Sequence, residues 1–372
     1  VQTEETINNI TREKCLAYYN TYYKPNTSYL VIVGDINLKE SKKLAKKYFG
    51  EWQKGEVPEH DYQFPNKTLG TRIAMVHKDD AVQSVISVTY PINLKPGNKD
   101  AIPAYLTNQI LGGGVFSGRL MLNLREDKGY TYGARSSLST DPYIGYFMAG
   151  AQVGTNVTDS AIVEFIYEMS RMRNEKVSKE DISLSKNVST GSFARSLERP
   201  QTIARFALNT QRYSLDENYY PTYLEKLNAV TIDEVQAMAK KYITPDNAIV
   251  LVVGDKNKLA ERLKPLDADG KIEFYDSYGH PVKEETKKSI AEGVTAKTVI
   301  DKYIDAIGGK ENLEKIEDKT MVASTSMNGM QIEQKTYQKA PNKYAMTTSM
   351  NGNVMVEQTF NGEKGILKSF QG

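Results

Sequence analysis

The chain has 372 residues, of which 40% are hydrophobic, and its 48 basic and 46 acidic residues leave a formal net charge of +2. This length suits about two domains of ordinary size, and the near balance of charge gives no footprint for nucleic acid. The single cysteine, Cys15, excludes an internal disulfide framework and a multi-cysteine zinc site. The apolar runs fall far short of the ~20 residues that span a bilayer, so the sequence predicts no transmembrane segment.

An internal repeat is present near both ends of the first 275 residues. Residues 10–35, "ITREKCLAYYNTYYKPNTSYLVIVGD", align without a gap to residues 230–255, "VTIDEVQAMAKKYITPDNAIVLVVGD". In each copy a threonine is placed to cap a helix, a proline ends it, and an apolar strand follows. An offset of 220 residues is too long for a solenoid and predicts a duplicated domain.

The repeat and the changes in composition predict the domain organisation. Residues 1–58 are expected to be the end of a first domain whose opening part is missing. A complete second domain of the same kind is expected over residues 59–275, followed by a polar linker over residues 276–294. Residues 295–372 predict a helix and a β-meander, which we expect to be truncated.

Within the complete copy, strands and helices form separate blocks. The patterns predict strands at 71–79 and 83–92, helices at 101–111 and 118–128, strands at 130–139 and 143–153, helical structure from 158 to about 242, and a last strand at 248–254. Such segregation is typical of a sheet with helices packed on one face. The expected fold class is α+β, a duplicated domain of antiparallel sheet plus helices, followed by a small antiparallel β segment.

The last part of the chain begins with a helix at Thr295 that ends at two glycines. Asn-Gly dipeptides at 328, 351 and 361 follow, between short alternating runs. Each such dipeptide between strands is a strong hairpin signal. These signals predict a small antiparallel sheet.

The search for a catalytic group within the chain is mostly negative. The three histidines, His60, His77 and His280, do not form the His-Glu-x-x-His pattern that presents two imidazoles to zinc. His77 with Asp79 and Asp80 is interpreted as a solvated strand end. The run "GGGVFSG" follows a helix and lacks the Gly-Lys-Ser/Thr of a phosphate loop, so it is interpreted as a helix stop and a flexible connection.

The stretch at residues 111–134, "LGGGVFSGRLMLNLREDKGYTYGA", resembles the second-domain motif of the pitrilysin/insulinase family of zinc peptidases. The repeated "YYKPNTSYLVIVGD" is also similar to the end of each domain in that family. The resemblance covers about residues 1–275. It implies two domains around a cavity, with the zinc motif in the first and an arginine–tyrosine pair in the second. Matched residue by residue, the catalytic and substrate-binding pair is Arg125 and Tyr132, whereas Tyr130 occupies a position that is commonly aliphatic.

The pair also has a physical purpose of its own. Peptide hydrolysis develops negative charge on the scissile carbonyl oxygen, and a phenol with a guanidinium nearby can donate hydrogen bonds to it or to adjacent carbonyls. The alternative is that Arg125 pairs with a surface acid while Tyr132 packs in the sheet. The surrounding motif favours the functional interpretation.

The resemblance implies zinc in the parent assembly with ligands outside this chain, and a peptide or unfolded protein as substrate. The implied partner is a zinc-bearing first domain or a subunit of the same family. Two alternatives stay open: a non-catalytic scaffold or partner subunit of the same fold, and an envelope carrier or assembly protein. The tail, through "DKYIDAIGG", "KAPNKY" and "FNGEKG", loosely resembles β-rich domains of envelope lipoprotein-sorting proteins. That likeness implies a bacterial periplasm or cell envelope.

Overall fold

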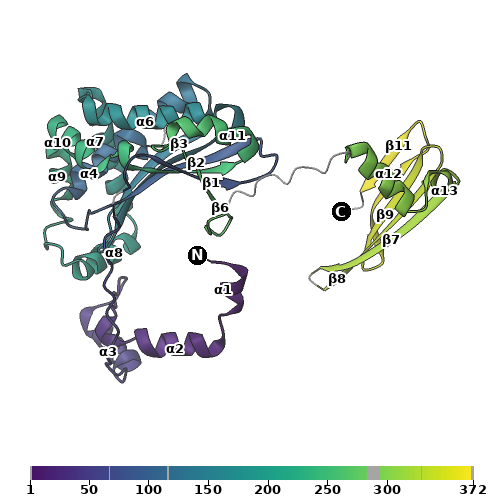
Figure 1. Cartoon of the computed structure of the whole chain (residues 1–372). Coiled ribbons are helices and arrows are strands. Elements are labelled where there is room, and N and C mark those ends of the chain that lie inside the picture. The colour runs from purple at the N-terminus through teal and green to yellow at the C-terminus, as the bar shows by residue number, and fades with distance from the viewer. Residues whose placement is uncertain (1, 67, 115–116, 283–293, 328, 370–372) are drawn as a thin grey trace. The chain divides into compact units, whose positions relative to one another are not determined.

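A computed structural model describes residues 2–66, 68–114, 117–282, 294–327 and 329–369. The chain divides into two units, Val1–Glu284 and Glu285–Gly372. The first unit holds the motif, and the second is a smaller sheet with its own helices (Figure 1).

The first unit is built on a six-stranded sheet in the order β3-β4-β2-β5-β1-β6. Its strands are β1 (Arg72–His77), β2 (Gln83–Ile92), β3 (Thr131–Ser139), β4 (Gly145–Gly154), β5 (Ile249–Gly254) and β6 (Glu273–Tyr275). Strand β1 runs parallel to both of its neighbours, β5 and β6. The pairs of β2 with β4, β2 with β5 and β3 with β4 are antiparallel. The sheet is therefore mixed, with an antiparallel half that carries the motif.

Helices cover one face of this sheet (Figure 1). The helices of this unit that follow β2 include α4 (Ala101–Asn108), α6 (Thr158–Asn174), α7 (Lys179–Ser196), α8 (Pro200–Arg212), α9 (Tyr223–Ala229), α10 (Ile232–Tyr242) and α11 (Lys256–Leu263), with 3₁₀ turns η4 (Thr155–Val157), η5 (Pro245–Asn247) and η6 (Lys264–Leu266). Alternate residues of β2, among them Ile86 and Val88, are buried in the core beneath the helices. Val85 and Met148 are exposed on the sheet. The α+β prediction is confirmed.

Asp100, just before α4, fastens that helix to the end of α10. The residue is 6% exposed, and its Oδ2 accepts hydrogen bonds from Lys241 Nζ at 2.6 Å and from the Tyr242 hydroxyl at 2.8 Å. Burial alone raises the pKa of Asp100, but these two hydrogen bonds and the nearby lysine charges outweigh burial and hold the pKa below its ordinary value. A lowered carboxyl pKa stabilises the fold above the ordinary pKa, and that stability is lost as pH falls through the lowered one.

Asp100→Ala is expected to lower the free energy of unfolding at pH 7 by about 2 kcal/mol, because it removes a buried carboxylate that accepts hydrogen bonds from Lys241 and Tyr242. Asp233→Ala is the matched control. Its ion pair with Lys176 has the same 2.6 Å separation, but the two side chains are 62% and 76% exposed, so the loss should stay below about 1 kcal/mol. Urea unfolding of both variants measures the difference, and equal losses would contradict it.

The repeat is only partly reproduced. Helices α2 (Arg12–Tyr22) and α10, and the turns η1 (Pro25–Thr27) and η5, recur at the same offset of 220 residues. Residues 29–34 do not form the predicted strand. Their counterpart β5 is held between β1 and β2, whereas no strand of the described residues pairs with 29–34. The backbone N–H and C=O groups of a strand need hydrogen bonds from neighbouring strands. The predicted strand was wrong because the prediction named no strand that pairs with residues 29–34.

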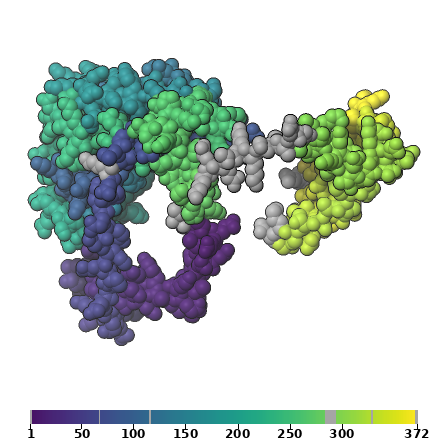
Figure 2. Space-filling view, viewed as in Figure 1, coloured from purple at the N-terminus to yellow at the C-terminus, as the bar shows by residue number. Residues whose placement is uncertain are grey.

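Solvent surrounds the N-terminal helices, coloured purple in Figure 2. Helices α1 (Glu4–Asn8), α2 and α3 (Leu38–Phe49) contain no buried residue. Tyr29, Leu30, Ile32 and Val33 are exposed as well. This N-terminal segment is therefore rich in apolar residues that are typical of a core, but these residues are exposed.

Both helices around the glycine run end in a π-helix, which the sequence did not predict. Helix α4 continues into η2 (Gln109–Gly113), and α5 (Arg119–Met121) continues into η3 (Leu122–Asp127). The glycines thus extend the first helix instead of stopping it. Gly112 is needed for a close approach to β3, because a Cβ there would lie 2.7 Å from the backbone nitrogen of Ser136.

The second unit is a five-stranded antiparallel sheet in the order β11-β10-β9-β8-β7. Its elements are α12 (Ala296–Ala306), α13 (Lys310–Glu314), β7 (Asp318–Met327), β8 (Met330–Lys339), β9 (Lys343–Met350), β10 (Asn353–Phe360) and β11 (Gly365–Ser369). Asn351 and Gly352 form the predicted hairpin turn, both with positive φ, and Asn361 and Gly362 begin the next. Asn328 lies outside the described residues. In the predicted linker, residues 276–282 form a turn that returns to β6.

Candidate active-site motif

Arg125 lies in η3, and a glycine cap turns the chain from this helix into β3. The N–H of Gly129 donates to the carbonyl of Arg125 at 3.2 Å, and the N–H of Tyr130 donates to the carbonyl of Leu124 at 2.8 Å. Gly129 has a φ of +66°, in the left-handed region that favours glycine. The pattern is a Schellman cap in which each bond spans one more residue, because the last helical turn is π instead of α.

A buried polar network holds η3 against α6. The Asn123 side-chain amide donates to Glu164 and to Glu168, each at 2.9 Å. Glu168 is buried and also forms an ion pair with Arg171 at 3.0 Å. The ion pair between Lys128 and Glu164 raises the pKa of Lys128. Because buried polar groups need such partners, this network fixes the position of the helix turn that carries the arginine.

The two tyrosines of the motif lie in different surroundings. Tyr130 packs against the hydrophobic core, whereas Tyr132 is 92% exposed. Residues two apart in a regular strand share a face, but these two tyrosines do not both belong to the strand. Tyr130 belongs to the cap, because β3 begins only at Thr131. The structure therefore leaves Tyr132 as the exposed phenol of the pair.

A β-bulge follows the first residue of β3. Tyr132 and Gly133 together oppose the single residue Gln152 of β4. The hydroxyl of Thr131 donates to the Gln152 carbonyl at 2.7 Å and accepts from the Gly133 N–H at 3.1 Å. Bulges re-aim side chains and are frequent next to active sites. The sequence analysis missed this bulge and the role of Thr131 in it; the Thr-x-Gly sequence at the start of the strand was the available signal.

Arg125 has a partly exposed guanidinium. Its side chain is 39% exposed, and Nη1 forms an ion pair with Oε1 of the neighbouring Glu126 at 3.4 Å. An exposed ion pair of this kind contributes little, so it does not tie up the guanidinium. The alternative interpretation expected Arg125 to pair with a surface acid and Tyr132 to pack in the sheet. Arg125 does pair with Glu126, but the ring of Tyr132 is exposed and does not pack in the sheet.

The motif thus offers two kinds of hydrogen-bond donor on one helix–turn–strand corner. The described residues give the Tyr132 hydroxyl no hydrogen bond, and Arg125 presents a planar fork suited to oxygen ligands. Both groups can donate to a carbonyl oxygen or to the charge that develops on it.

The described residues do not fit a catalytic zinc. They contain no group of three or more histidine, cysteine, aspartate or glutamate side chains that could hold a metal ion. His77 bonds Asp79 at 2.8 Å and accepts from the N–H of Lys256, and His280 bonds Asp276 at 3.0 Å. These histidines support a strand end and a turn. None of the helices in the described ranges has the length and apolarity of a membrane span.

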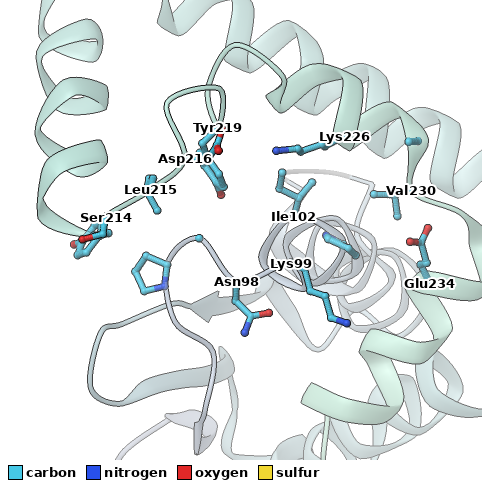
Figure 3. A pocket seen from close by; sticks show the side chains of 15 residues that line it. Asn98, Lys99, Ile102, Ser214, Leu215, Asp216, Tyr219, Lys226, Val230 and Glu234 are labelled. Carbon is cyan, nitrogen blue, oxygen red and sulfur yellow. The ribbon is translucent and has the colours of Figure 1, made fainter.

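A separate cavity of about 550 Å³ lies between α4, the α8–α9 connection and the start of α10 (Figure 3). Lys226 extends toward the ring of Tyr219, 5.7 Å from its centre. Asp216 and Glu234 also line the cavity, but each already accepts hydrogen bonds from its own turn or cap. The residues described as lining it include none from the motif at 111–134.

The cavity and Tyr132 lie at opposite ends of β2. The first residue of β2, Gln83, pairs with Gly154, next to the partner of Thr131. The cavity is lined by residues 96–99, which follow the last residue of β2. A strand of this length spans ~30 Å, so the cavity is not part of the arginine–tyrosine corner.

Comparisons with known proteins agree with the motif. The family profile described as "Peptidase M16 inactive domain" matches residues 9–189. The Bacillus subtilis (strain 168) protein named "Uncharacterized zinc protease YmxG" is 24% identical over 261 residues, which make up 67% of this chain and 59% of that protein. The chain therefore spans little more than half the length of this relative.

Solved structures share the fold. The peptidase M16 inactive domain from Pseudomonas fluorescens matches with a TM-score of 0.62 at 21% identity, over 68% of this chain and 60% of that one. The periplasmic protease PqqL from Escherichia coli matches with a TM-score of 0.57 at 16% identity, over 68% of this chain and 28% of that one. Together with the motif at 111–134, these findings support the resemblance of the chain to the pitrilysin/insulinase family of zinc peptidases.

Proposed function

We propose that the chain is the C-terminal, substrate-binding half of a zinc metalloendopeptidase, and that it supplies Arg125 and Tyr132 to peptide hydrolysis at a zinc site outside this chain. The observation that carries the proposal is the exposure of Tyr132, 92%, beside a glycine cap that sets Arg125 just before it. A large aromatic residue exposed to this degree has no role in the core. The described residues give its hydroxyl no hydrogen bond, so this group can donate one to a substrate.

The proposed substrate is a peptide or an unfolded protein. Its backbone carbonyls are the acceptors that suit a phenol and a guanidinium. Tyr132 would donate to the oxygen on which charge develops, and Arg125 to that oxygen or to an adjacent carbonyl. The chain would therefore bind and stabilise, while the metal and its ligands belong to the other half.

The proposed partner is a zinc-bearing domain or subunit of the same family. The zinc-protease name of the Bacillus subtilis relative supports zinc in the assembly, and the word "inactive" in the family description supports a half that does not act alone. We propose that residues 1–58 complete this partner's domain, residues 59–275 form the second domain, residues 276–294 link it onward, and residues 295–372 form a separate β domain. The bacterial periplasm or cell envelope is the proposed location, in keeping with the periplasmic protease PqqL.

The repeat indicates which N-terminal side chains the partner would cover. The offset of 220 matches Cys15 with Val235 and Tyr19 with Ala239. Both residues of the second copy are fully buried, whereas Cys15 and Tyr19 are exposed. The apolar residues of 29–34 match those of β5 in the same way. A domain of the same fold would therefore bury this face of α2.

Docking of the zinc-bearing domain is expected to slow alkylation of Cys15 by a maleimide at least about tenfold, because a buried thiol is shielded from reagent. Cys15 is the one cysteine of the chain, so mass spectrometry of its peptide reports the rate in the isolated chain and in the assembly. Glu13→Cys in a Cys15→Ala background is the control, since its counterpart Asp233 is exposed. Unchanged alkylation of Cys15 in the assembly would count against the domain proposal.

Two alternatives fit the same fold. A non-catalytic scaffold or partner subunit would keep the fold without needing Arg125 and Tyr132. An envelope carrier or assembly protein would depend on the second unit, residues 295–372. Both alternatives predict that substitutions at the arginine–tyrosine corner leave the biological activity unchanged, which separates them from the peptidase proposal.

A further inference from the structure

We propose that Thr131 is a positioning residue for Tyr132, and that its hydroxyl holds the β-bulge that presents the phenol to solvent. This inference rests on the proposed function for its catalytic consequence. Its structural part concerns the chain alone. The supporting observations are the register of β3, the burial of its neighbours and the hydrogen bonds of one hydroxyl group.

The register shows why the bulge needs support. Thr131 pairs with Val153 and Ala134 pairs with Ala151. Two residues of β3 therefore lie between these pairs, opposite one residue of β4. Val153, Ala134 and Ala151 are all buried. The core therefore fixes the strand on both sides of the bulge, and the extra residue must be absorbed between them. Tyr132 lies in that interval.

The Thr131 hydroxyl bridges the interruption in the ladder. It donates to the Gln152 carbonyl across the strands at 2.7 Å and accepts from the N–H of Gly133 at 3.1 Å. One side-chain oxygen thus ties the two ends of the bulge to each other and to β4. Tyr132, between the two bonded residues, has its backbone restrained while its side chain stays free. A regular ladder would make such a side-chain bridge unnecessary.

The residues next to Tyr132 in the chain provide no other contact that would hold the phenol in place. Gly133 has no side chain, and the Tyr132 ring is 92% exposed. On the other side the glycine cap restrains Tyr130, not Tyr132. Catalysis by hydrogen bonding depends on donors held in place before the charge develops, and a displacement of about 1 Å can cost a hundredfold in rate. The hydroxyl of Thr131 is the group that limits such displacement.

Thr131→Val tests the inference, because it keeps the shape and removes the hydroxyl. In the chain alone, hydrogen exchange followed by NMR should show the Gly133 amide exchanging at least about tenfold faster, since its acceptor is lost. In an active assembly cleaving a fluorogenic unstructured peptide, kcat should fall about tenfold with KM changed less than about threefold. Thr131→Ser should restore both values.

Thr89→Val is the matched control. The Thr89 hydroxyl donates to the Phe147 carbonyl between β2 and β4 at 2.9 Å, so this variant loses a similar bond in the same sheet, away from the bulge. It should leave kcat and Gly133 exchange unchanged. Unchanged Gly133 exchange in Thr131→Val, failure of Thr131→Ser to rescue, or an equal loss of kcat in Thr89→Val would overturn the inference. Full kcat in Thr131→Val while Tyr132→Phe is impaired would overturn it too. If Tyr132→Phe itself is silent, the proposed function fails, and the exchange measurement alone decides whether Thr131 holds the bulge.

Discussion

Tyr132→Phe is expected to lower kcat about a hundredfold in an assembly with the zinc-bearing half, at a cost on the order of 3 kcal/mol. The phenol oxygen is proposed to meet charge that exists mainly in the transition state, so its loss belongs to the chemical step and leaves KM nearly unchanged. The ring itself is almost fully exposed. Removing one oxygen from it should therefore leave the fold intact.

Tyr130→Phe is the control for this experiment, and the structure makes it a close one. The two tyrosines are two residues apart, but Tyr130 packs against the core beside the glycine cap. Its substitution removes the same atom without touching an exposed donor, so kcat should be nearly unchanged. Steady-state kinetics with both variants, checked by thermal melts, distinguishes the two positions. Loss of kcat in Tyr130→Phe with full activity in Tyr132→Phe would mean that Tyr130, not Tyr132, is the hydrogen-bond donor.

Arg125→Lys belongs to the same experiment and should lower kcat/KM on the order of tenfold, because an ammonium lacks the planar fork that can hold two oxygens at once. The ion pair to Glu126 is an exposed contact at 3.4 Å and does not compensate. Arg135→Lys, at an exposed arginine of β3, is the control. Equal losses of kcat/KM in Arg125→Lys and Arg135→Lys would indicate a general effect of replacing a guanidinium by an ammonium, not a role for Arg125.

Strands of the first unit could be predicted closely where apolar and polar residues alternate along the sequence, as they do in β2. The expected strand at 83–92 is β2 with the same bounds, and the expected strand at 130–139 is β3 apart from its first residue. Each of these segments lies within the same chain as its neighbours. The apolar run at 29–34 has the same kind of sequence as β5 and forms no strand, because pairing partners are a tertiary condition that composition does not contain.

The geometry of the corner could not be predicted in the same way. One extra residue in a helix turn rotates the side chains that follow by about 100°, yet it leaves the helical pattern of the sequence unchanged. The π-helix is specified by contacts such as that of Asn123 with Glu168, which is 45 residues further along the chain. The bulge is specified by Thr131 and Gln152 on different strands. The sequence motif pointed to Arg125 and Tyr132, while these long-range contacts decide how the two side chains are presented.

The central claim is that this chain contributes to peptide hydrolysis without carrying the metal, and it predicts complete dependence of activity on both halves. The most direct measurement is hydrolysis of one quenched fluorescent peptide by this chain, by the zinc-bearing half, and by the two together, with zinc content determined for each sample after dialysis. We expect zinc only in samples that contain the other half, and hydrolysis only in the mixture. Hydrolysis by this chain alone with tightly held zinc, or by the other half alone as fast as by the mixture, would contradict the account.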